Sequence, residues 1–213
     1  MGYARIALAV VCAGALALAF PSRASAQVCL GIPAEPGEIS VHGEVISSGS
    51  SASYGGRLGM NFNTEFAFDF GLRRPLHDDG RGLILNGGIA YEMEDYRPPV
   101  CFTFGVRHER RPLADGGEAT RTLIPIGLGV GKRLGSAKSF SLALFLRPEY
   151  LIRLKPDPEQ EYESFWGELG ERSEGRGTIG LLMATPFLYA TGSLEIATRD
   201  YTPSVSIGVG VTF

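Results

Sequence analysis

The sequence predicts an all-β chain: a closed antiparallel transmembrane β-barrel of about ten strands, preceded by a cleaved signal peptide. Three observations support this prediction. The chain starts with a short apolar stretch, period-two alternation recurs along the remainder, and the second face of the alternating segments carries glycine, small polar residues and arginine. Alternation with a period of two is typical of strands that have one apolar face.

The first 26 residues have the layout of a secretory signal peptide. Met1 to Arg5 is a positively charged start, residues 6–20 are apolar, and Ala24-Ser25-Ala26 provides a small-residue cleavage pattern. The alternative is an uncleaved N-terminal anchor. The apolar run argues against it, because a membrane-spanning helix needs about 20 apolar residues. We expect residues 27–36 to form a periplasmic N-terminal segment and residues 37–213 to form the barrel.

Cleavage would also change the charge of the chain. Residues 1–26 contain Arg5 and Arg23 and no acidic residue, so their removal changes the formal net charge from −3 to −5. This mild acidity gives no reason to expect a nucleic-acid partner.

Ten segments alternate apolar residues with small or polar ones, and their lengths suit strands that cross a bilayer at a tilt. They are residues 39–45, 57–62, 65–72, 83–94, 100–107, 124–131, 140–147, 178–185, 193–197 and 204–213. The alternation does not break between Leu58 and Leu72, which makes the turn near Asn63-Thr64 the least secure boundary. Eight strands is the alternative count.

The connections between these segments alternate in length, which is the pattern of outer-membrane barrels. We expect short turns near residues 63–64, 95–99, 134–138 and 187–191, and longer polar loops near residues 48–53, 74–81, 110–119 and 152–174. The longer loops would face the exterior of the cell.

The composition of the second face distinguishes a membrane barrel from a soluble one. A soluble barrel would carry lysine on its water-facing side, whereas only Lys132, Lys138 and Lys155 among the 20 basic residues are lysine, and glycine occurs 29 times. We therefore expect the bulky apolar set to contact lipid, which forbids open sheet edges. Tyrosines near strand ends would form interfacial girdles: Tyr54, Tyr91, Tyr150, Tyr189 and Tyr201.

Charged residues on the second face would point into the bore, where each needs a partner because desolvation is costly. They are Glu44, Arg57, Glu65, Asp69, Arg73, Glu92, Arg107, Arg121, Arg133, Arg147, Glu149, Glu195 and Arg199. Side chains can fill a barrel of this size, so a network of ion pairs is one interpretation. A narrow water-filled pore is the other.

Two cysteines remain after cleavage, Cys29 before the first strand and Cys101 at the start of the fifth. An exported chain meets an oxidising compartment, so we expect a Cys29–Cys101 disulfide that fastens the N-terminal segment to the periplasmic rim. Two buried free thiols are the alternative.

The sequence contains no convincing catalytic, cofactor or metal site. His77-Asp78-Asp79 is the nearest candidate for an omptin-like protease, but a polar turn, with Asp and Gly serving the backbone, is the better explanation. Serine nucleophile elbows, zinc-ligand spacings and phosphate-binding loops are absent. We expect a protein that is not an enzyme and needs no cofactor.

The final strand ends on an aromatic residue after apolar residues at every second position: Val205, Ile207, Val209, Val211 and Phe213. This strand looks like the C-terminal β-signal of bacterial outer-membrane proteins, and the mature chain resembles the small OmpA/OmpX-like and opacity-type barrels. The resemblance implies an outer-membrane location, with lipid and the barrel assembly machinery as partners.

The resemblance also implies a structural or surface-interaction role through extracellular loops, with an extracellular ligand that the sequence does not identify. A small porin-like channel for ions or solutes is the alternative, and an omptin-like enzyme is a remote one.

Overall fold

A computed structural model describes residues 26–32, 35–49, 51–63, 65–76, 82–93, 100–112, 118–135, 139–154, 174–198 and 203–213. The predicted signal peptide before residue 26 therefore lies outside the described residues. The strands are β1 (Ile39–Ser48), β2 (Ser51–Asn61), β3 (Phe66–Pro75), β4 (Leu83–Met93), β5 (Val100–Pro112), β6 (Glu118–Gly135), β7 (Ser141–Leu154), β8 (Glu174–Ala184), β9 (Leu188–Ala197) and β10 (Ser204–Thr212).

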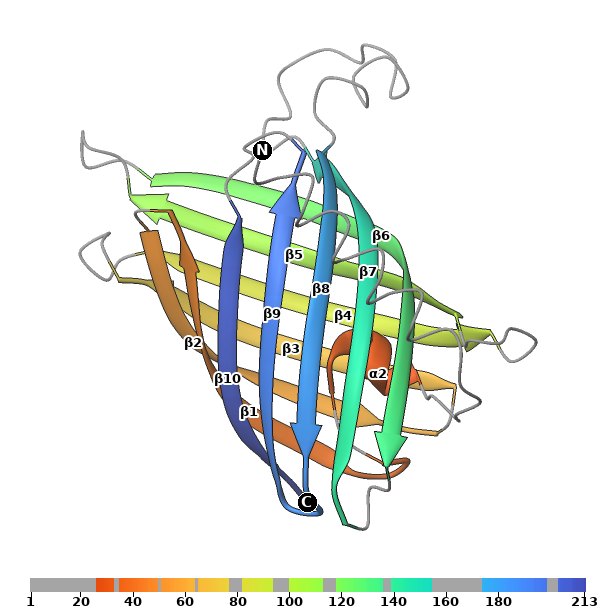
Figure 1. Ribbon diagram of the computed structural model, residues 1–213. Coiled ribbons are helices and arrows are strands. Elements are labelled where there is room, and N and C mark those ends of the chain that lie inside the picture. The colour runs from red at the N-terminus through yellow and green to blue at the C-terminus, as the bar shows by residue number, and fades with distance from the viewer. Residues whose placement is uncertain are drawn as a thin grey trace, which may run out of the picture.

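These ten strands form one closed antiparallel barrel in which each strand pairs with its sequence neighbours (Figure 1). The last strand returns to the first, with Ser40 opposite Thr212 and Ser48 opposite Ser204. The predicted fold and the count of ten are confirmed, and the alternative of eight strands is wrong.

The insecure boundary between the second and third segments is a tight turn. The side-chain Oδ1 of Asn63 accepts hydrogen bonds from the backbone N–H groups of Glu65 and Phe66, at 3.0 and 2.7 Å. The backbone N–H of Phe62 donates to the carbonyl of Phe66. These paired residues are four positions apart, an even number, so the alternation continues through the turn without a break.

One connection differs from its prediction. A longer loop was expected near residues 48–53, but β1 ends at Ser48 and β2 begins at Ser51. Gly49 has a φ of 55°, a left-handed conformation that glycine adopts without steric cost and that tight hairpins require. Most of the other predicted long loops, residues 77–81, 113–117 and 155–173, lie outside the described residues.

The outer face of the barrel is apolar. Side chains that alternate along the strands leave large hydrophobic groups exposed, such as Ile207 at 66 % and Phe213 at 76 %. Exposed aromatic residues gather at the end with short turns, including Phe62, Phe140 and Phe187. A band of this kind suits lipid rather than water, and the barrel is a transmembrane one.

The predicted tyrosine girdle is correct in part. Tyr54, Tyr91 and Tyr150 are exposed on the outer face, whereas Tyr201 lies outside the described residues. The prediction for Tyr189 is wrong, because its side chain is buried inside the barrel and its hydroxyl lies 2.8 Å from Nδ1 of His42.

The short helix α2 (Ala26–Leu30) lies inside the barrel, against strands β3 to β7 (Figure 1). Val28, Cys29, Leu30 and Ile32 are almost completely buried. The sequence predicts that residues 27–36 form a periplasmic segment fastened to the rim of the barrel. The structure instead places residues 28–32 in the bore, at the end where the strands are joined by short turns. Within the described residues, no helix is long and apolar enough to cross a membrane.

Candidate functional site: the bore and its plug

The wall of the bore is hollowed by glycine where the N-terminal segment packs. A Cβ atom added at Gly129 would lie 2.8 Å from Cβ of Cys29, and one at Gly131 would lie 2.5 Å from Cγ1 of Val28. On the opposite wall, a Cβ at Gly59 would lie 2.9 Å from Cδ1 of Ile32. These distances are too short for real Cβ contacts, so residues 28–32 fit only because the wall lacks side chains there. We call residues 28–32 the plug.

Three connections fasten the plug and the residues that follow it. A disulfide joins Cys29 to Cys101 of β5, as the sequence predicts. The guanidinium of Arg57 donates from Nη2 to the backbone carbonyl of Leu30 at 2.9 Å. Beyond the plug, Nη1 of Arg133 donates to Oε1 of Glu35 at 2.8 Å.

A cavity of about 740 Å³ occupies the other part of the bore. Leu30 and Gly31 of the plug form its floor, and it extends to Ser48, Ser51 and Ser204, at the strand ends opposite the short turns. We call this cavity the cup. In the described part of the barrel, the plug thus occupies one part of the bore and the cup the other.

One row of inward residues crosses six neighbouring strands in register. The register places Glu44 opposite Gly55, Gly55 opposite Arg73, and Arg73 opposite Ile84. The same row continues from Ile84 to Glu109 and from Glu109 to Arg121. It therefore carries acidic and basic groups in alternation along the wall of the cup.

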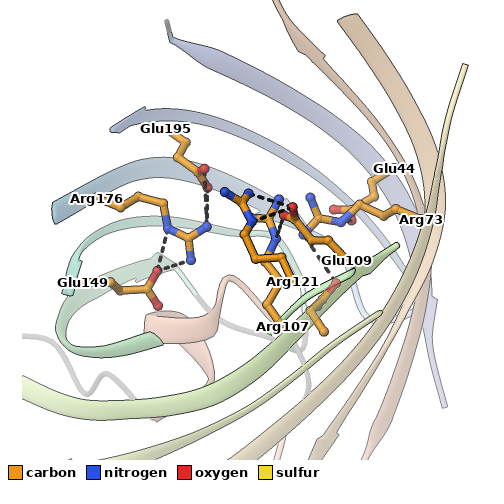
Figure 2. A network of polar contacts seen from close by, with 9 residues as sticks. Glu44, Arg73, Arg107, Glu109, Arg121, Glu149, Arg176 and Glu195 are labelled. Carbon is orange, nitrogen blue, oxygen red and sulfur yellow. Dashed lines mark hydrogen bonds and ion pairs between the residues drawn. The ribbon is translucent and has the colours of Figure 1, made fainter. Parts of the chain in front are cut away.

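Ion pairs connect this row (Figure 2). Glu109 contacts Nε of Arg107 and Nη2 of Arg121, each at 2.7 Å. Glu44 contacts Nε of Arg73 at 3.1 Å. One carboxylate, Glu109, therefore serves two guanidinium groups.

A second group of ion pairs lies on β7, β8 and β9. Glu149 contacts Nε of Arg147 at 3.2 Å and Nη2 of Arg176 at 2.5 Å. Arg176 also reaches Glu195 at 3.3 Å. Elsewhere on the wall, Arg57 on β2 pairs with Asp69 on β3 at 2.8 Å.

Glycines let these long side chains lie along the wall instead of filling the bore. A Cβ at Gly55 would lie 2.7 Å from Cγ of Arg73, and one at Gly127 would lie 2.8 Å from Cγ of Glu149. A Cβ at Gly88 would collide with Oδ1 of Asp69. Glycine at these three positions therefore leaves room for a charged neighbour, and at Gly55 and Gly127 it also avoids a backbone carbonyl of the next strand.

The carboxylates differ in depth. The side chain of Glu195 is 31 % exposed, more than its partner Arg176 at 8 %, whereas two others are almost completely buried. The side chains of Glu109 and Glu149 are 2 % and 6 % exposed, whereas those of Arg107 and Arg121 are 18 % and 34 % exposed. Among the described residues that line the cup, six are arginine and three are glutamate. They are Arg57, Arg73, Arg107, Arg121, Arg147 and Arg176, with Glu44, Glu174 and Glu195.

Among the described residues, the other charged ones that were predicted to face the bore do not line the cup. Asp69 and Glu149 lie beside a smaller cavity next to the cup. Glu65 and Glu92 lie near the short-turn end, where the N–H of Glu92 donates to the carbonyl of Glu65 and Glu92 stands opposite Cys101. Arg199 lies outside the described residues.

Sequence reasoning missed two members of the network, Glu109 and Arg176. Glu109 continues the alternation of residues 101–107 by one more inward position, and Arg176 stands two residues before the inward Thr178. Extending each predicted strand by two residues would have found both.

Nothing in the described bore has the arrangement of a catalytic or metal site. His42 hydrogen-bonds Tyr189, and its Nε2 lies 3.6 Å from Glu44. The described residues contain no group of three or more side chains that could hold a metal ion. His77, Asp78 and Asp79, the sequence candidates for an omptin-like site, lie outside the described residues.

No protein-family model and no curated protein sequence matches this chain. Solved structures share the barrel shape at low identity. The NanC porin is 11 % identical, with 82 % of this chain and 98 % of that chain covered and a TM-score of 0.42.

Two other barrels match over a similar length. The N-terminal β-barrel domain of Pseudomonas aeruginosa OprF is 10 % identical. The match covers 84 % of this chain and 98 % of that domain, with a TM-score of 0.36. A de novo designed transmembrane β-barrel is 10 % identical, with 84 % and 98 % covered and a TM-score of 0.41. Because these scores are low, we base the fold on the strand pairing of this chain itself.

Proposed function

We propose that this chain is a non-enzymatic outer-membrane barrel whose bore is closed by its own N-terminal segment, with a structural or surface-interaction role at its extracellular side. The plug carries this proposal. Residues 28–32 are packed against wall glycines and are covalently attached to β5 through Cys29 and Cys101. In a barrel that conducts solutes, a tethered and buried segment inside the bore would obstruct the path.

Several observations support the outer membrane as the location. The outer face carries the apolar band described above, and the sequence begins with the pattern of an export signal. In this orientation the plug would face the periplasm, an oxidising compartment in which disulfides persist. Membrane lipid is then one partner, and the assembly machinery that would read the final strand is the other.

A small channel is the second candidate. The volume of the cup, about 740 Å³, and its charged wall favour this function. Conduction would require the plug to leave the bore or to leave a path beside it. The two functions therefore differ in one measurable property, the ionic conductance of the oxidised protein.

Conductance in planar lipid bilayers tests the proposal. We expect the oxidised wild-type protein to give no sustained current, and a variant that lacks residues 27–32 to give steady openings. The Cys29→Ser/Cys101→Ser variant, which keeps the plug but loses its tether, should give brief openings. Cell fractionation and heat-modifiable gel mobility establish that each variant is folded and in the outer membrane. Sustained currents from the oxidised wild type would refute the closed bore and favour the channel.

A further inference from the structure

Arginines outnumber acidic residues in the lining of the cup. Six arginines and three glutamates line it among the described residues, although the network as a whole contains more carboxylates. The remaining acids, such as Glu109 and Asp69, lie behind the guanidinium groups with side chains 2 % and 7 % exposed. The lining of the cup therefore carries more positive than negative groups, although Glu195 is itself 31 % exposed.

The donors of one cluster are not all used by its carboxylate. Arg121 donates from Nε and Nη2 to Glu109 at 3.1 and 2.7 Å, and each guanidinium has five N–H donors. Arg107 shares the same carboxylate through its Nε. Two cations around one anion leave a formal charge of about +1 at this point of the wall, and both arginines line the cup.

Arg73 adds a third guanidinium to the same row. Ile84 on β4 stands opposite Arg73 on one side and opposite Glu109 on the other. Figure 2 shows Arg107 and Arg121 beside Glu109, with Arg73 and Glu44 to one side of them and Arg176 to the other. Arginine is the side chain best suited to carboxylate and phosphate groups, because its planar fork matches two acceptor oxygens at once.

We propose that the cup binds a small organic anion that carries carboxylate or phosphate groups, held mainly by Arg73, Arg107 and Arg121. The cup has the volume of a small-molecule site. Its floor is formed by Leu30 and Gly31 of the plug, so an anion that enters is retained rather than passed on. This inference rests on the proposed closed bore and assigns a ligand class to its open side.

Titration of the full, oxidised protein in detergent tests the inference. The probes are citrate and inorganic phosphate, with glucose as the neutral control and choline as the cationic control. At low ionic strength we expect saturable binding, by calorimetry, of citrate, of phosphate or of both. The affinity should fall as salt is added, because salt screens the guanidinium charges.

Neighbouring residues on one strand provide matched variants. Arg73 lines the cup, whereas Arg74 is exposed on the outer face. Arg73→Gln and Arg121→Gln should each weaken binding by about tenfold, the usual value of one charge-assisted hydrogen bond. Arg74→Gln should leave binding unchanged. If a glutamine variant fails the heat-modifiability test for folding, the corresponding Arg→Lys variant, which keeps the charge but loses the fork, replaces it and should also bind more weakly.

Three results would overturn the inference. They are no saturable binding of citrate or phosphate by the wild type up to about 10 mM, equal binding of choline, or equal losses in Arg73→Gln and Arg74→Gln. A barrel that conducts ions but binds these anions would refute the closed bore alone. A silent barrel that binds neither anion would refute the ligand class alone.

Discussion

Glycine in the interior of a strand usually weakens a sheet, yet inward positions of this barrel carry it repeatedly. The structure gives each case a local reason. Gly129 and Gly131 accommodate the plug, whereas Gly55 and Gly127 accommodate the side chains of Arg73 and Glu149. An outward glycine such as Gly177 has no atom within 4 Å of a built Cβ. The two kinds of position should therefore respond differently to substitution.

Gly131→Val should destabilise the protein, and Gly177→Val should not. The added side chain at position 131 would overlap Val28, and overpacking of this kind costs about 1–3 kcal/mol. At position 177 a β-branched residue would meet lipid and fit the strand. Urea unfolding of both variants from lipid vesicles measures the difference. Equal stabilities would show that the plug does not occupy the wall at Gly131.

Residue-level patterns predicted which face most bore residues occupy but not what they contact. Alternation alone placed Arg57 and Arg73 inside. It could not show that Arg57 binds Leu30 of the plug, because that contact joins residues 27 positions apart across a closed barrel. Tyr189 was misassigned for a related reason. A tyrosine near a strand end suits either face, and only the parity of β9, together with His42 on β1, places it inside.

At the scale of elements, the final strand closes the barrel. Backbone hydrogen bonds run from Phe213 N–H to the carbonyl of Ile39 at 2.9 Å and from Ile39 N–H to the carbonyl of Phe213 at 3.2 Å. The aromatic ring of Phe213 itself is exposed. Its side chain therefore adds little packing inside the barrel, which is consistent with a role in recognition during assembly.

Phe213→Ala should lower the amount of folded barrel in the outer membrane several-fold, whereas Phe187→Ala should not. Both rings are exposed to a similar extent, 76 % and 73 %, and both lie at the short-turn end, so the loss of lipid contact is matched. Quantitative blotting of outer-membrane fractions provides the measurement. If both variants accumulate equally, the terminal aromatic is only part of the girdle and not a signal.

The ten strands were predictable because each repeats one pattern over enough residues for its period to be clear. Helix α2 was not predictable in the same way. It has five residues, AQVCL, and begins at Ala26, the last residue of the predicted export signal. The apolar side chains of α2 and of Ile32 after it are buried only when Gly59, Gly129 and Gly131 form the wall around them. These glycines come from strands far apart in the sequence. The hydrophobic periodicity of the sequence does not predict a short segment whose packing partners come together only in the closed fold.

For the whole molecule, the distribution of side chains is the reverse of that in a soluble barrel. Large apolar groups cover the exterior, while ion pairs, glycines and a tethered plug occupy the interior. This arrangement is stable only in a bilayer, which accepts the apolar face and requires that no sheet edge remains open. Closure between β1 and β10 meets that requirement.

The most direct measurement of this arrangement compares nitroxide labels at two neighbouring residues of β10. Ile207 is 66 % exposed on the outer face, and Ser206 lines the cup. In lipid vesicles, a label on Ile207→Cys should collide with dissolved oxygen and be protected from a water-soluble nickel complex. A label on Ser206→Cys should show the opposite preference. Nickel access at position 207 together with oxygen access at position 206 would contradict the account.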